Sequence, residues 1–497
     1  MKCIVLFGAG KSSSALINYL KTVSTQHNWL VFVADYDIVL ALQKTGYHDF
    51  VKPVQVDVYD EEQRSSLIKQ ADVVISLLPP AYHTIIASDC VQFNKHLLTA
   101  SYIDETIKAL QQDIKEKGLL FLCEMGLDPG IDHMSAMQLI HRIQKEGGSI
   151  HSFKSHCGGL IAPESDDNPW HYKISWNPRN VIMAGKAGAA YKENGLQVIA
   201  AYEQLFINNQ YVNIPGYGRY AWYPNRDSLS YATLYHLESA DTFIRTTLRH
   251  PEFCLGWKSV IELKLTDETS FYNTDGLTIA EFFKEHFDKI GFGNWINNVL
   301  MSRLTYAREL TDKLMKVIEA EEVAKEAGKE PEEVLVIDGS GELTSLDITD
   351  EKNKAAEVVA GKMHEANLIL KQLFYLGLND DTLINKGTCH VADILQFILE
   401  KKLALQQGDK DLVIMLHEIE YIQNNQLKKL SSYLAVKGED NINTAMAKTV
   451  GLPLGIAAKL LLEGKIKETG LHIPIVPSIY EPVLAELAQH GIVFKDC

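Results

Sequence analysis

The chain contains few cysteines, and their spacing forms no pattern. Seven cysteines are scattered through 497 residues, and none belongs to a C-x-x-C pair. An odd number of isolated thiols argues against a disulfide framework and against a structural zinc site. We therefore expect a reducing, cytoplasmic location and no bound metal.

Positive charge and long apolar stretches are also scarce. With 48 Lys and Arg against 64 Asp and Glu, the formal net charge is −16, which argues against general binding to nucleic acids or anionic membranes. No run of about 18 apolar residues, the length of a membrane span, is evident. The first residues, Met1-Lys2-Cys3, lead directly into an expected strand. The sequence therefore predicts neither membrane association nor a signal peptide.

The first clear pattern is that of a nucleotide-binding turn. The apolar run 2–7 is followed by Gly8-Ala9-Gly10-Lys11-Ser12-Ser13 and then by apolar residues at helical spacing. A dinucleotide site needs this order of strand, turn and helix, because glycines let the backbone approach a pyrophosphate at the helix N-terminus. Ser13 stands at the third glycine position of the usual fingerprint. The residues expected to bind the dinucleotide are Gly8, Gly10, Lys11 and Ser12.

Strand and helix patterns alternate through the first 125 residues, which predicts a doubly wound parallel sheet. Ligands of such sheets lie beyond the carboxyl ends of the strands. Leu78 and Pro79 lie at the end of the fourth strand, where the nicotinamide half of a dinucleotide normally lies, so we expect both to contact the cofactor. Ser101 and Tyr102 follow the fifth strand on the same edge. The six expected strands are 2–7, 30–35, 52–58, 72–78, 96–101 and 119–124.

The second strand ends at Asp35, and no Lys or Arg occurs between Lys21 and Lys44. An acid at this position accepts hydrogen bonds from the ribose 2′-hydroxyl of NAD, whereas NADP enzymes usually place an Arg near the 2′-phosphate. A 2′-phosphate would meet the Asp35 carboxylate without a nearby cation. We therefore expect NAD(P) as cofactor, with NAD favoured over NADP.

Residues 124–133, which read EMGLDPGIDH, are the best single indication of chemistry in the chain. They follow the sixth strand, at the edge of the sheet where ligands bind. Glu124, Asp128 and Asp132 lie close together in this segment, although neighbouring carboxylates repel. We therefore expect part of a functional site here.

Two arginines and one cysteine in the middle of the chain are further candidates. In so acidic a chain, Arg226 and Arg245 suggest a pocket for carboxylates, which arginine binds bidentately. An ordinary ion pair is the alternative role for each arginine, and it competes more strongly for Arg245 than for Arg226. No neighbouring His or Lys pattern favours a thiolate at Cys157, so covalent catalysis is not expected.

These motifs together resemble, in order along the chain, those of the saccharopine dehydrogenase family of the glutamate-forming type, also called saccharopine reductases. An ordered set of this kind is far more specific than a nucleotide fingerprint alone. The matching stretches are 8–10, 101–102, 126–133, 155–165, 223–228, 445–453 and 464–466.

The resemblance implies a Rossmann-like cofactor domain, a second α/β domain with a mixed sheet, and an inserted helical domain. It also implies that the second domain forms a homodimer. The helical spacing found independently over 250–405 agrees with the third part. Within it, the charged segment near 311–360 is expected to be a surface insertion. The three domains would span 1–125 with 471–497, 126–249 with 406–470, and 250–405.

The resemblance further implies a reversible reaction in which saccharopine, NAD(P)+ and water give L-glutamate, 2-aminoadipate 6-semialdehyde and NAD(P)H. Asp128 would hold the reacting amine, while Tyr102 and Cys157 would form hydrogen bonds near the reacting centre; these three are the catalytic candidates. Arg245 is added as a substrate-binding candidate from its residue type. By resemblance, the substrate site is lined by Ser101, Tyr102, Asp128, Cys157, Gly158, Arg226 and Thr246.

Two alternatives remain open from the sequence. The first is another imine-reducing enzyme, such as a carboxynorspermidine dehydrogenase, although a polyamine substrate would favour a more acidic pocket. The second is a redox-sensing protein that binds the cofactor without catalysis. The motifs around Asp128 and Cys157 argue against the second alternative.

Overall fold

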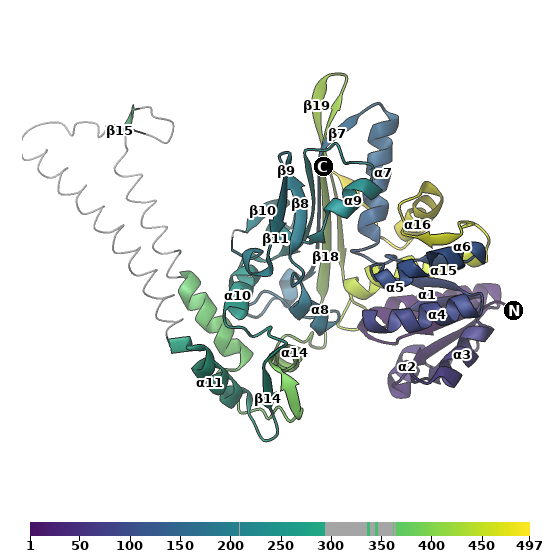
Figure 1. The fold of residues 1–497 in the computed structure, drawn as a ribbon, viewed down its shortest axis with the longest axis horizontal. Helices are drawn as coiled ribbons and strands as arrows, with labels where there is room; N and C mark the ends of the chain where they lie inside the picture. Colours follow the sequence, from purple (N-terminus) through teal and green to yellow (C-terminus); the bar gives the residue numbers. More distant parts are fainter. Residues whose placement is uncertain (208, 294–334, 338–342, 346–360, 362–363) are drawn as a thin grey trace, which may run out of the picture. The chain divides into compact units, whose positions relative to one another are not determined.

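A computed structural model of the chain describes residues 1–207, 209–293, 335–337, 343–345, 361 and 364–497 (Figure 1). These residues form two compact units. The first unit comprises Met1–Asp167, His171–Cys254 and Leu399–Cys497, and the second comprises Asn168–Trp170 and Leu255–Ile398.

The amino-terminal region of the first unit contains a parallel seven-stranded sheet in the order β20-β6-β5-β4-β1-β2-β3. Strands β1 and β6 are apolar along their length and β4 is apolar up to Ser76, and all three are buried at every residue, as expected for a parallel sheet covered on both faces. The doubly wound class predicted from the sequence is confirmed. The strands are β1 (Cys3–Phe7), β2 (Leu30–Asp35), β3 (Val51–Gln55), β4 (Val73–Ser76), β5 (His96–Thr99), β6 (Leu120–Leu122) and β20 (Gly470–His472).

The strand order of this sheet determines where a ligand can bind. The chain winds outward from β1 in both directions, through β2 and β3 on one side and β4, β5 and β6 on the other. In sheets of this kind the ligand crevice lies at the carboxyl ends of the strands where the order reverses, here β1 and β4. The connecting helices are η1 (Lys11–Ser13), α1 (Ser14–His27), α2 (Ile38–Thr45), α3 (Glu61–Gln70), η2 (Pro80–Tyr82), α4 (His83–Gln92), α5 (Glu105–Ala109) and α6 (Gln111–Glu116).

The second sheet of the first unit is mixed and has ten strands. Its long central strand β7 pairs in parallel with β13 and antiparallel with β18. The strands are β7 (Ser149–Ile161), β8 (Ala189–Glu193), β9 (Leu196–Ala200), β10 (Gln210–Ile214), β11 (Gly218–Pro224), β12 (Arg226–Asp227), β13 (Thr242–Arg249), β18 (Asp411–Gln423), β19 (Gln426–Lys437) and β21 (Lys495–Asp496). The helices beside it are η3 (Pro163–Ser165), α7 (Ile131–Lys145), α8 (Pro178–Met183), η4 (Tyr202–Gln204) and α9 (Leu229–Leu234).

The carboxyl-terminal segment contributes to both sheets. β20 completes the first sheet beside β6, whereas β21 pairs with β19 of the second sheet. The expectation that all of 471–497 returns to the nucleotide-binding domain is therefore wrong for the last strand. Between them, α16 (Pro477–Gln489) packs against α7 and against α15 (Ala445–Leu462).

Helix α15 contacts both sheets, through β4 and β5 of the first and β18 of the second. By its length and composition alone, α15 could span a membrane, and it is the one helix among the described residues of which this holds. The expectation that the chain has no stretch of this length and composition is therefore wrong. Most of this helix is buried in the first unit, as in a core helix. Apolar side chains from α15 and both sheets belong to one continuous core.

The second unit holds most of the region predicted to be helical. Its helix α11 (Ile279–Ile290) begins at a capping box, in which Thr278 and Glu281 bond to each other's backbone amides. The sequence did not predict the two-stranded sheet of β14 (Phe271–Asn273) and β17 (Thr388–His390). Two helices span the boundaries of this unit. Helix α10 (Pro251–Glu262) begins in the first unit and continues into the second, and helix α14 (Val391–Lys402) begins in the second unit and ends in the first. Strands β15 (Leu335–Ile337) and β16 (Leu343–Ser345) pair with each other.

Some sequence predictions for this region are not tested. The helices predicted at 292–304, 308–328 and the start of 352–376 lie mostly outside the described residues, as does most of the charged segment 311–360. Apart from the last strand, discussed above, the predicted boundaries of the three domains likewise stay a prediction.

Candidate active site

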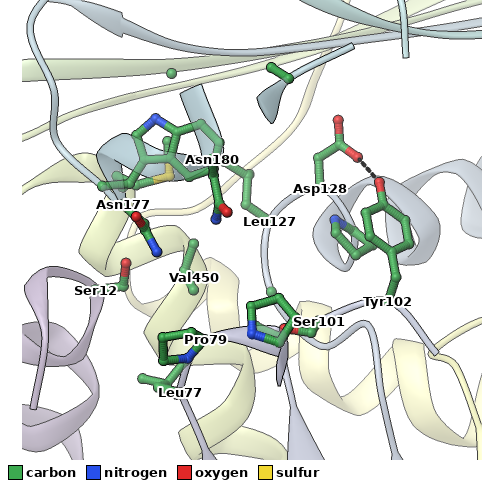
Figure 2. Close-up of a pocket in the computed structure, with 18 of the residues that line it drawn as sticks. Ser12, Leu77, Pro79, Ser101, Tyr102, Leu127, Asp128, Asn177, Asn180 and Val450 are labelled. Carbon is green, nitrogen blue, oxygen red and sulfur yellow. Dashed lines mark hydrogen bonds between the residues drawn. The ribbon is translucent and has the colours of Figure 1, made fainter. Parts of the chain in front are cut away.

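A pocket of about 770 Å³ lies in the first unit, at the carboxyl ends of the parallel strands and against one face of the second sheet (Figure 2). Its volume is within the range of small-molecule sites. The nucleotide-binding domain contributes Gly10, Lys11, Ser12, Leu78, Pro79 and Ser101, all but Ser101 predicted to bind the cofactor. The substrate side contributes Tyr102, Asp128, Cys157, Asn225, Arg226 and Arg249.

The glycine-rich turn has the geometry that a dinucleotide requires. Gly8 has φ +102°, and a Cβ there would lie 3.0 Å from the carbonyl oxygen of Leu77. Gly8 therefore permits the tight turn, although it does not itself line the pocket. A Cβ on Gly10 would meet nothing within 4 Å, so the backbone at this pocket-lining residue is open to a close-lying group. Ser13 at the third glycine position is buried and donates a hydrogen bond to the Gly10 carbonyl at 2.9 Å.

Successive side chains of β7 point to opposite faces of the sheet, which affects one of the predicted site residues. Cys157 and Gly159 line the pocket, whereas Gly158 lies on the opposite face of the strand. A Cβ on Gly158 would lie 2.7 Å from the Cβ of Leu248. Gly158, which was predicted to line the substrate site, instead allows close packing inside the sheet, and Gly159 lines the pocket.

The same alternation applies to β13. The hydroxyl of Thr246 is buried and bonds to Nδ1 of His156 at 2.7 Å on the far face. Thr247 lines the pocket instead. The side chain predicted to line the substrate site, Thr246, thus lies one residue away from the one that faces the pocket, and a shift of one residue places a side chain on the other face of a strand.

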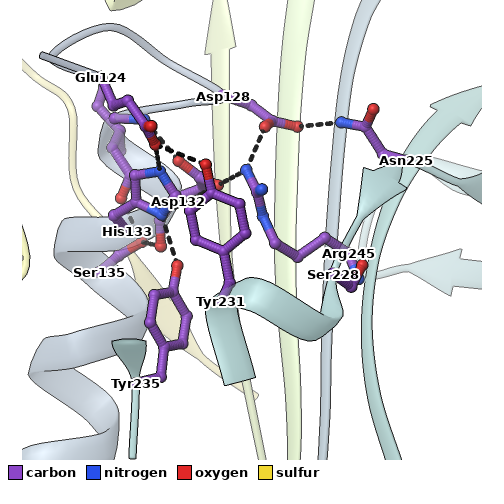
Figure 3. A network of polar contacts seen from close by, with 12 residues as sticks. Glu124, Asp128, Asp132, His133, Ser135, Asn225, Ser228, Tyr231, Tyr235 and Arg245 are labelled. Carbon is purple, nitrogen blue, oxygen red and sulfur yellow. Dashed lines mark hydrogen bonds and ion pairs between the residues drawn. The ribbon is translucent and has the colours of Figure 1, made fainter. Parts of the chain in front are cut away.

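Arg245 is 2% exposed and is bound within the protein (Figure 3). Its Nη2 donates to Oδ1 of Asp128 and to Oδ2 of Asp132, both at 2.7 Å. The prediction that Arg245 binds a substrate carboxylate is therefore not supported; Arg245 instead offsets the two carboxylates of the 124–133 segment.

The remaining acid of that segment lies in a buried hydrogen-bond network (Figure 3). Oε2 of Glu124 bonds to Nε2 of His133 and accepts a hydrogen bond from the Tyr231 hydroxyl, both at 2.8 Å. The other ring nitrogen of His133 bonds to the Tyr235 hydroxyl at 2.5 Å. The clustered carboxylates thus each have a partner, which explains how the segment can hold them.

Asp128 and Asp132 share Arg245 but differ in their acidity. Burial and the Asp132 carboxylate raise the pKa of Asp128 to about 6. Although burial also opposes ionisation of Asp132, His133, Arg245 and the amide of Gly130 hold its pKa below the usual value. Asp132 therefore stays ionised, while Asp128 can exchange a proton near neutral pH.

Of the three acids in the 124–133 segment, Asp128 is the one that lines the pocket. The Tyr102 hydroxyl donates to its Oδ1 (Figure 2) and the Asn225 amide to its Oδ2 (Figure 3), each at 3.4 Å. Burial raises the pKa of Tyr102, so this hydroxyl stays protonated and acts as a donor. Two of the three catalytic candidates, Asp128 and Tyr102, are thus brought together by the fold.

Two arginines face the pocket in different environments. Arg226 is exposed, and its guanidinium lies 4.9 Å from the ring centroid of Tyr102. Arg249, which the sequence analysis missed, is 3% exposed, and its Nε has no hydrogen-bond partner among the described residues. Its guanidinium lies 5.3 Å from the ring centroid of Tyr172. The spacing in the sequence could have identified Arg249. It follows Thr247 by two residues and Arg245 by four, and in a strand this spacing places all three side chains on one face.

Cys157 lines the pocket as a buried thiol. Burial and the nearby carboxylates raise its pKa well above the usual value. A protonated thiol is a poor nucleophile, in agreement with the expectation that Cys157 does not act covalently.

Comparison with known proteins identifies the family. Residues 126–492 match the model described as "Saccharopine dehydrogenase C-terminal domain", and residues 4–122 match "Saccharopine dehydrogenase NADP binding domain". The chain belongs to the saccharopine dehydrogenase family. The family predicted by resemblance is thus confirmed.

Individual members of the saccharopine dehydrogenase family match over the whole chain. The "Saccharopine dehydrogenase [NADP(+), L-glutamate-forming]" of Pyricularia oryzae is 32% identical, covering 100% of this chain and 98% of the relative. The "Alpha-aminoadipic semialdehyde synthase" of Arabidopsis thaliana is 33% identical over 98% of this chain but only 44% of the relative. The chain thus spans about half the length of this relative and of its mammalian counterparts.

The fold comparison agrees with the sequence comparisons. The apo saccharopine dehydrogenase (L-Glu forming) of Saccharomyces cerevisiae superposes with a TM-score of 0.74 at 27% identity, covering 100% of both chains. The arrangement of two sheets described above is therefore that of a solved family member.

The surroundings of Asp35 differ from those expected from the sequence. Oδ2 of Asp35 accepts a hydrogen bond from the Ala9 amide at 2.6 Å, and its Oδ1 accepts one from the Asp37 amide at 2.9 Å. Lys44 reaches back over the glycine-rich turn, where its ammonium donates to the Gly10 carbonyl and to the Ser13 hydroxyl. The premise that no cation lies near Asp35 is therefore wrong, and the predicted preference for NAD is not supported.

Removing the Arg245 guanidinium should destabilise the fold. Arg245→Met leaves two buried carboxylates without their cation, and breaking a buried pair costs about 3–5 kcal/mol. We expect a loss of this size in the free energy of unfolding, measured by chemical denaturation. The matched control, Arg226→Met, removes an exposed arginine and should change stability by less than about 0.5 kcal/mol.

A second substitution tests the cause of this loss. Arg245→Met combined with Asp132→Asn removes one of the stranded charges and should recover part of the stability. Equal stability of Arg245→Met and Arg226→Met would contradict the structural role of Arg245.

Proposed function

We propose that the protein catalyses the glutamate-forming oxidation of saccharopine to 2-aminoadipate 6-semialdehyde with NADP+. The observation that carries the proposal is the charge arrangement of the pocket: Arg226 and Arg249 face a space beside Asp128, and that space continues to the glycine-rich turn. Saccharopine has three carboxylates and a secondary amine, so it needs cations around a central acid. The family and its full-length relatives support the same reaction.

The buried Arg249 gives this proposal its strongest physical support. Among the described residues no carboxylate forms an ion pair with Arg249, and its Nε is unpartnered. A buried charge without a counter-charge is costly, and a substrate carboxylate would supply the missing partner. A polyamine, the substrate class of the alternative considered from the sequence, would instead place further positive charge beside it.

The cofactor would be held by Gly10, Lys11 and Ser12 at the pyrophosphate and by Leu78 and Pro79 near the nicotinamide. When bound, the nicotinamide supplies the acceptor for a hydride. The open backbone at Gly10 fits this assignment.

Asp128 has the position and acidity of the group that exchanges the proton. The amine of saccharopine must lose its proton before the neighbouring carbon can give up a hydride, and a general base works best with a pKa near the working pH. Asp128, with a pKa of about 6, meets this condition. Arg245 and Tyr102 hold its carboxylate by hydrogen bonds. Water then adds to the resulting imine, and cleavage of the C–N bond releases glutamate.

The direct test is an absorbance assay at 340 nm with saccharopine and NADP+. Saccharopine-dependent formation of NADPH supports the proposal, and binding of NADPH without turnover would favour the alternative of a cofactor-binding sensor. Assembly as a homodimer and a cytoplasmic location stay predictions from the family resemblance and the cysteine pattern.

Arg226→Ala should weaken saccharopine binding selectively. Loss of one charge-assisted partner of a carboxylate costs roughly 2–4 kcal/mol, or about 30- to 1000-fold. Steady-state kinetics should show this increase in KM for saccharopine with little change for the cofactor. The matched control is Arg219→Ala, because Arg219 is exposed and stacks on Tyr211 away from the pocket. Equal kinetics for both variants would refute the role of Arg226.

The pH dependence should report the acidity of Asp128. In saccharopine oxidation the ionised carboxylate accepts the amine proton, so kcat/KM should fall as the pH drops below about 6. Asp128→Asn should remove this acid limb and lower kcat/KM by about 10²- to 10⁴-fold. The melting temperature is expected to change little. An acid limb that persists in Asp128→Asn would assign the proton transfer to another group.

We propose that Lys44 favours NADP over NAD, because its ammonium lies at the glycine-rich turn beside Asp35. Burial lowers the pKa of Lys44 to about 8, so it is largely protonated at pH 7. Lys44→Met should reduce kcat/KM with NADP+ by about 10-fold, the effect of losing about 1.4 kcal/mol. Efficiency with NAD+ should change much less. Lys52→Met, at an exposed site on β3, serves as the control. Equal losses with both cofactors would mean that Lys44 only supports the turn.

A further inference from the structure

Three side chains beside the pocket form a hydrogen-bonded chain that the proposed reaction does not use. Ser76 ends β4, His83 begins α4, and Ser101 follows β5. Nδ1 of His83 lies 2.9 Å from the Ser76 hydroxyl, and Nε2 lies 2.8 Å from the Ser101 hydroxyl. Ser76 is 0% exposed and His83 2%, while all three residues line the pocket.

The His83 ring is neutral at working pH. Its burial lowers its pKa to about 4, although the carboxylate of Asp104 acts in the opposite direction. A neutral imidazole donates from one nitrogen and accepts at the other. The neighbouring hydroxyls therefore determine which nitrogen carries the proton.

These hydroxyls favour a proton on Nε2. Among the described residues, the recorded partner of the buried Ser76 hydroxyl is Nδ1 of His83. A proton on Nδ1 would leave that hydroxyl without an acceptor. It would also make the single lone pair of Nε2 serve the hydroxyls of both Ser101 and Thr99, the latter at 3.3 Å. With the proton on Nε2, only the longer hydrogen bond from the Thr99 hydroxyl to Nε2 is lost.

We propose that His83 is a positioning residue that fixes Ser101 as a hydrogen-bond donor to an acceptor oxygen of the bound ligand. Ser76 donates to Nδ1, Nε2–H donates to the Ser101 oxygen, and the Ser101 proton is then free to point into the pocket. The acceptor is a carboxylate of the substrate or the carboxamide oxygen of the nicotinamide. The inference rests on the proposed function for the identity of this ligand.

The tautomer can be measured on the protein without any ligand. Nitrogen-15 NMR of histidine-labelled protein should show an unprotonated Nδ1 and a protonated Nε2 for His83 at pH 7. The signal is assigned by its loss in His83→Gln. A proton on Nδ1, or on both nitrogens, would overturn the inference. This measurement does not depend on whether the protein oxidises saccharopine.

Two substitutions at the same position test the donor itself. His83→Gln places an amide N–H near Nε2, whereas His83→Leu removes the donor. We expect His83→Leu to lose about 10- to 100-fold in ligand affinity or kcat/KM, the usual effect of losing a hydrogen bond to a charged or polar group. His83→Gln should stay within about 3-fold of the unmodified protein. Equal losses in both variants would overturn the inference.

A double substitution tests whether His83 acts through Ser101. His83→Leu combined with Ser101→Ala should lose no more than Ser101→Ala alone, because coupled residues are not additive. Additive losses would contradict the chain. Two measurements distinguish the two acceptors. The Kd for NADPH, from fluorescence titration, should change if Ser101 donates to the nicotinamide carboxamide, and the KM for saccharopine should change if it donates to a substrate carboxylate. If the unmodified protein fails to oxidise saccharopine, the proposed reaction fails, and the NMR and NADPH measurements still decide the role of His83.

Discussion

The buried guanidinium of Arg245 joins the two halves of the first unit. Asp128 and Asp132 belong to the segment that leaves the parallel sheet, whereas Arg245 lies on β13 of the second sheet. Two carboxylates this close would repel in a medium of low dielectric constant. The shared cation offsets part of that repulsion, and Asp132 is further stabilised as a carboxylate by the Gly130 amide and His133. Asp128 is thereby held in place without losing its ability to take up a proton, which is the property that the proposed chemistry needs.

The features that the sequence predicted well depend on local patterns. The parallel sheet follows from buried apolar runs separated by helical spacing, and the turn at Gly8 follows from a φ that other residues rarely adopt. The 124–133 segment was recognised as unusual because its carboxylates are close in the chain itself. The turn and the acidic segment can be recognised from neighbouring residues, and the sheet from the repeated order of such local patterns, so no knowledge of the tertiary fold is needed.

The errors concern side-chain direction and distant partners. Thr246 and Gly158 were named where Thr247 and Gly159 line the pocket, because residue type does not reveal which strand face is turned toward a cavity. Arg245 and Arg249 look alike in sequence, and only the fold shows that the first has carboxylate partners. Lys44 lies 34 residues after Gly10 in the chain, yet it bonds to that residue's carbonyl. Such contacts depend on the path of the whole chain.

Helix α15 has a consequence for how the protein can be divided. A Cβ on its Gly451 would lie 3.0 Å from the amide nitrogen of Leu16 and 3.2 Å from the carbonyl oxygen of Ser12, so this distant helix rests directly on the cofactor turn. β20 also completes the first sheet from beyond residue 122. A fragment limited to 4–122 would expose the face of α1 that α15 covers and would lack an edge strand. The region that the family model delimits is therefore smaller than the packed structure around the cofactor turn. Because α15 contacts both this turn and β18, we expect a nucleotide bound at the turn to stabilise the second sheet as well.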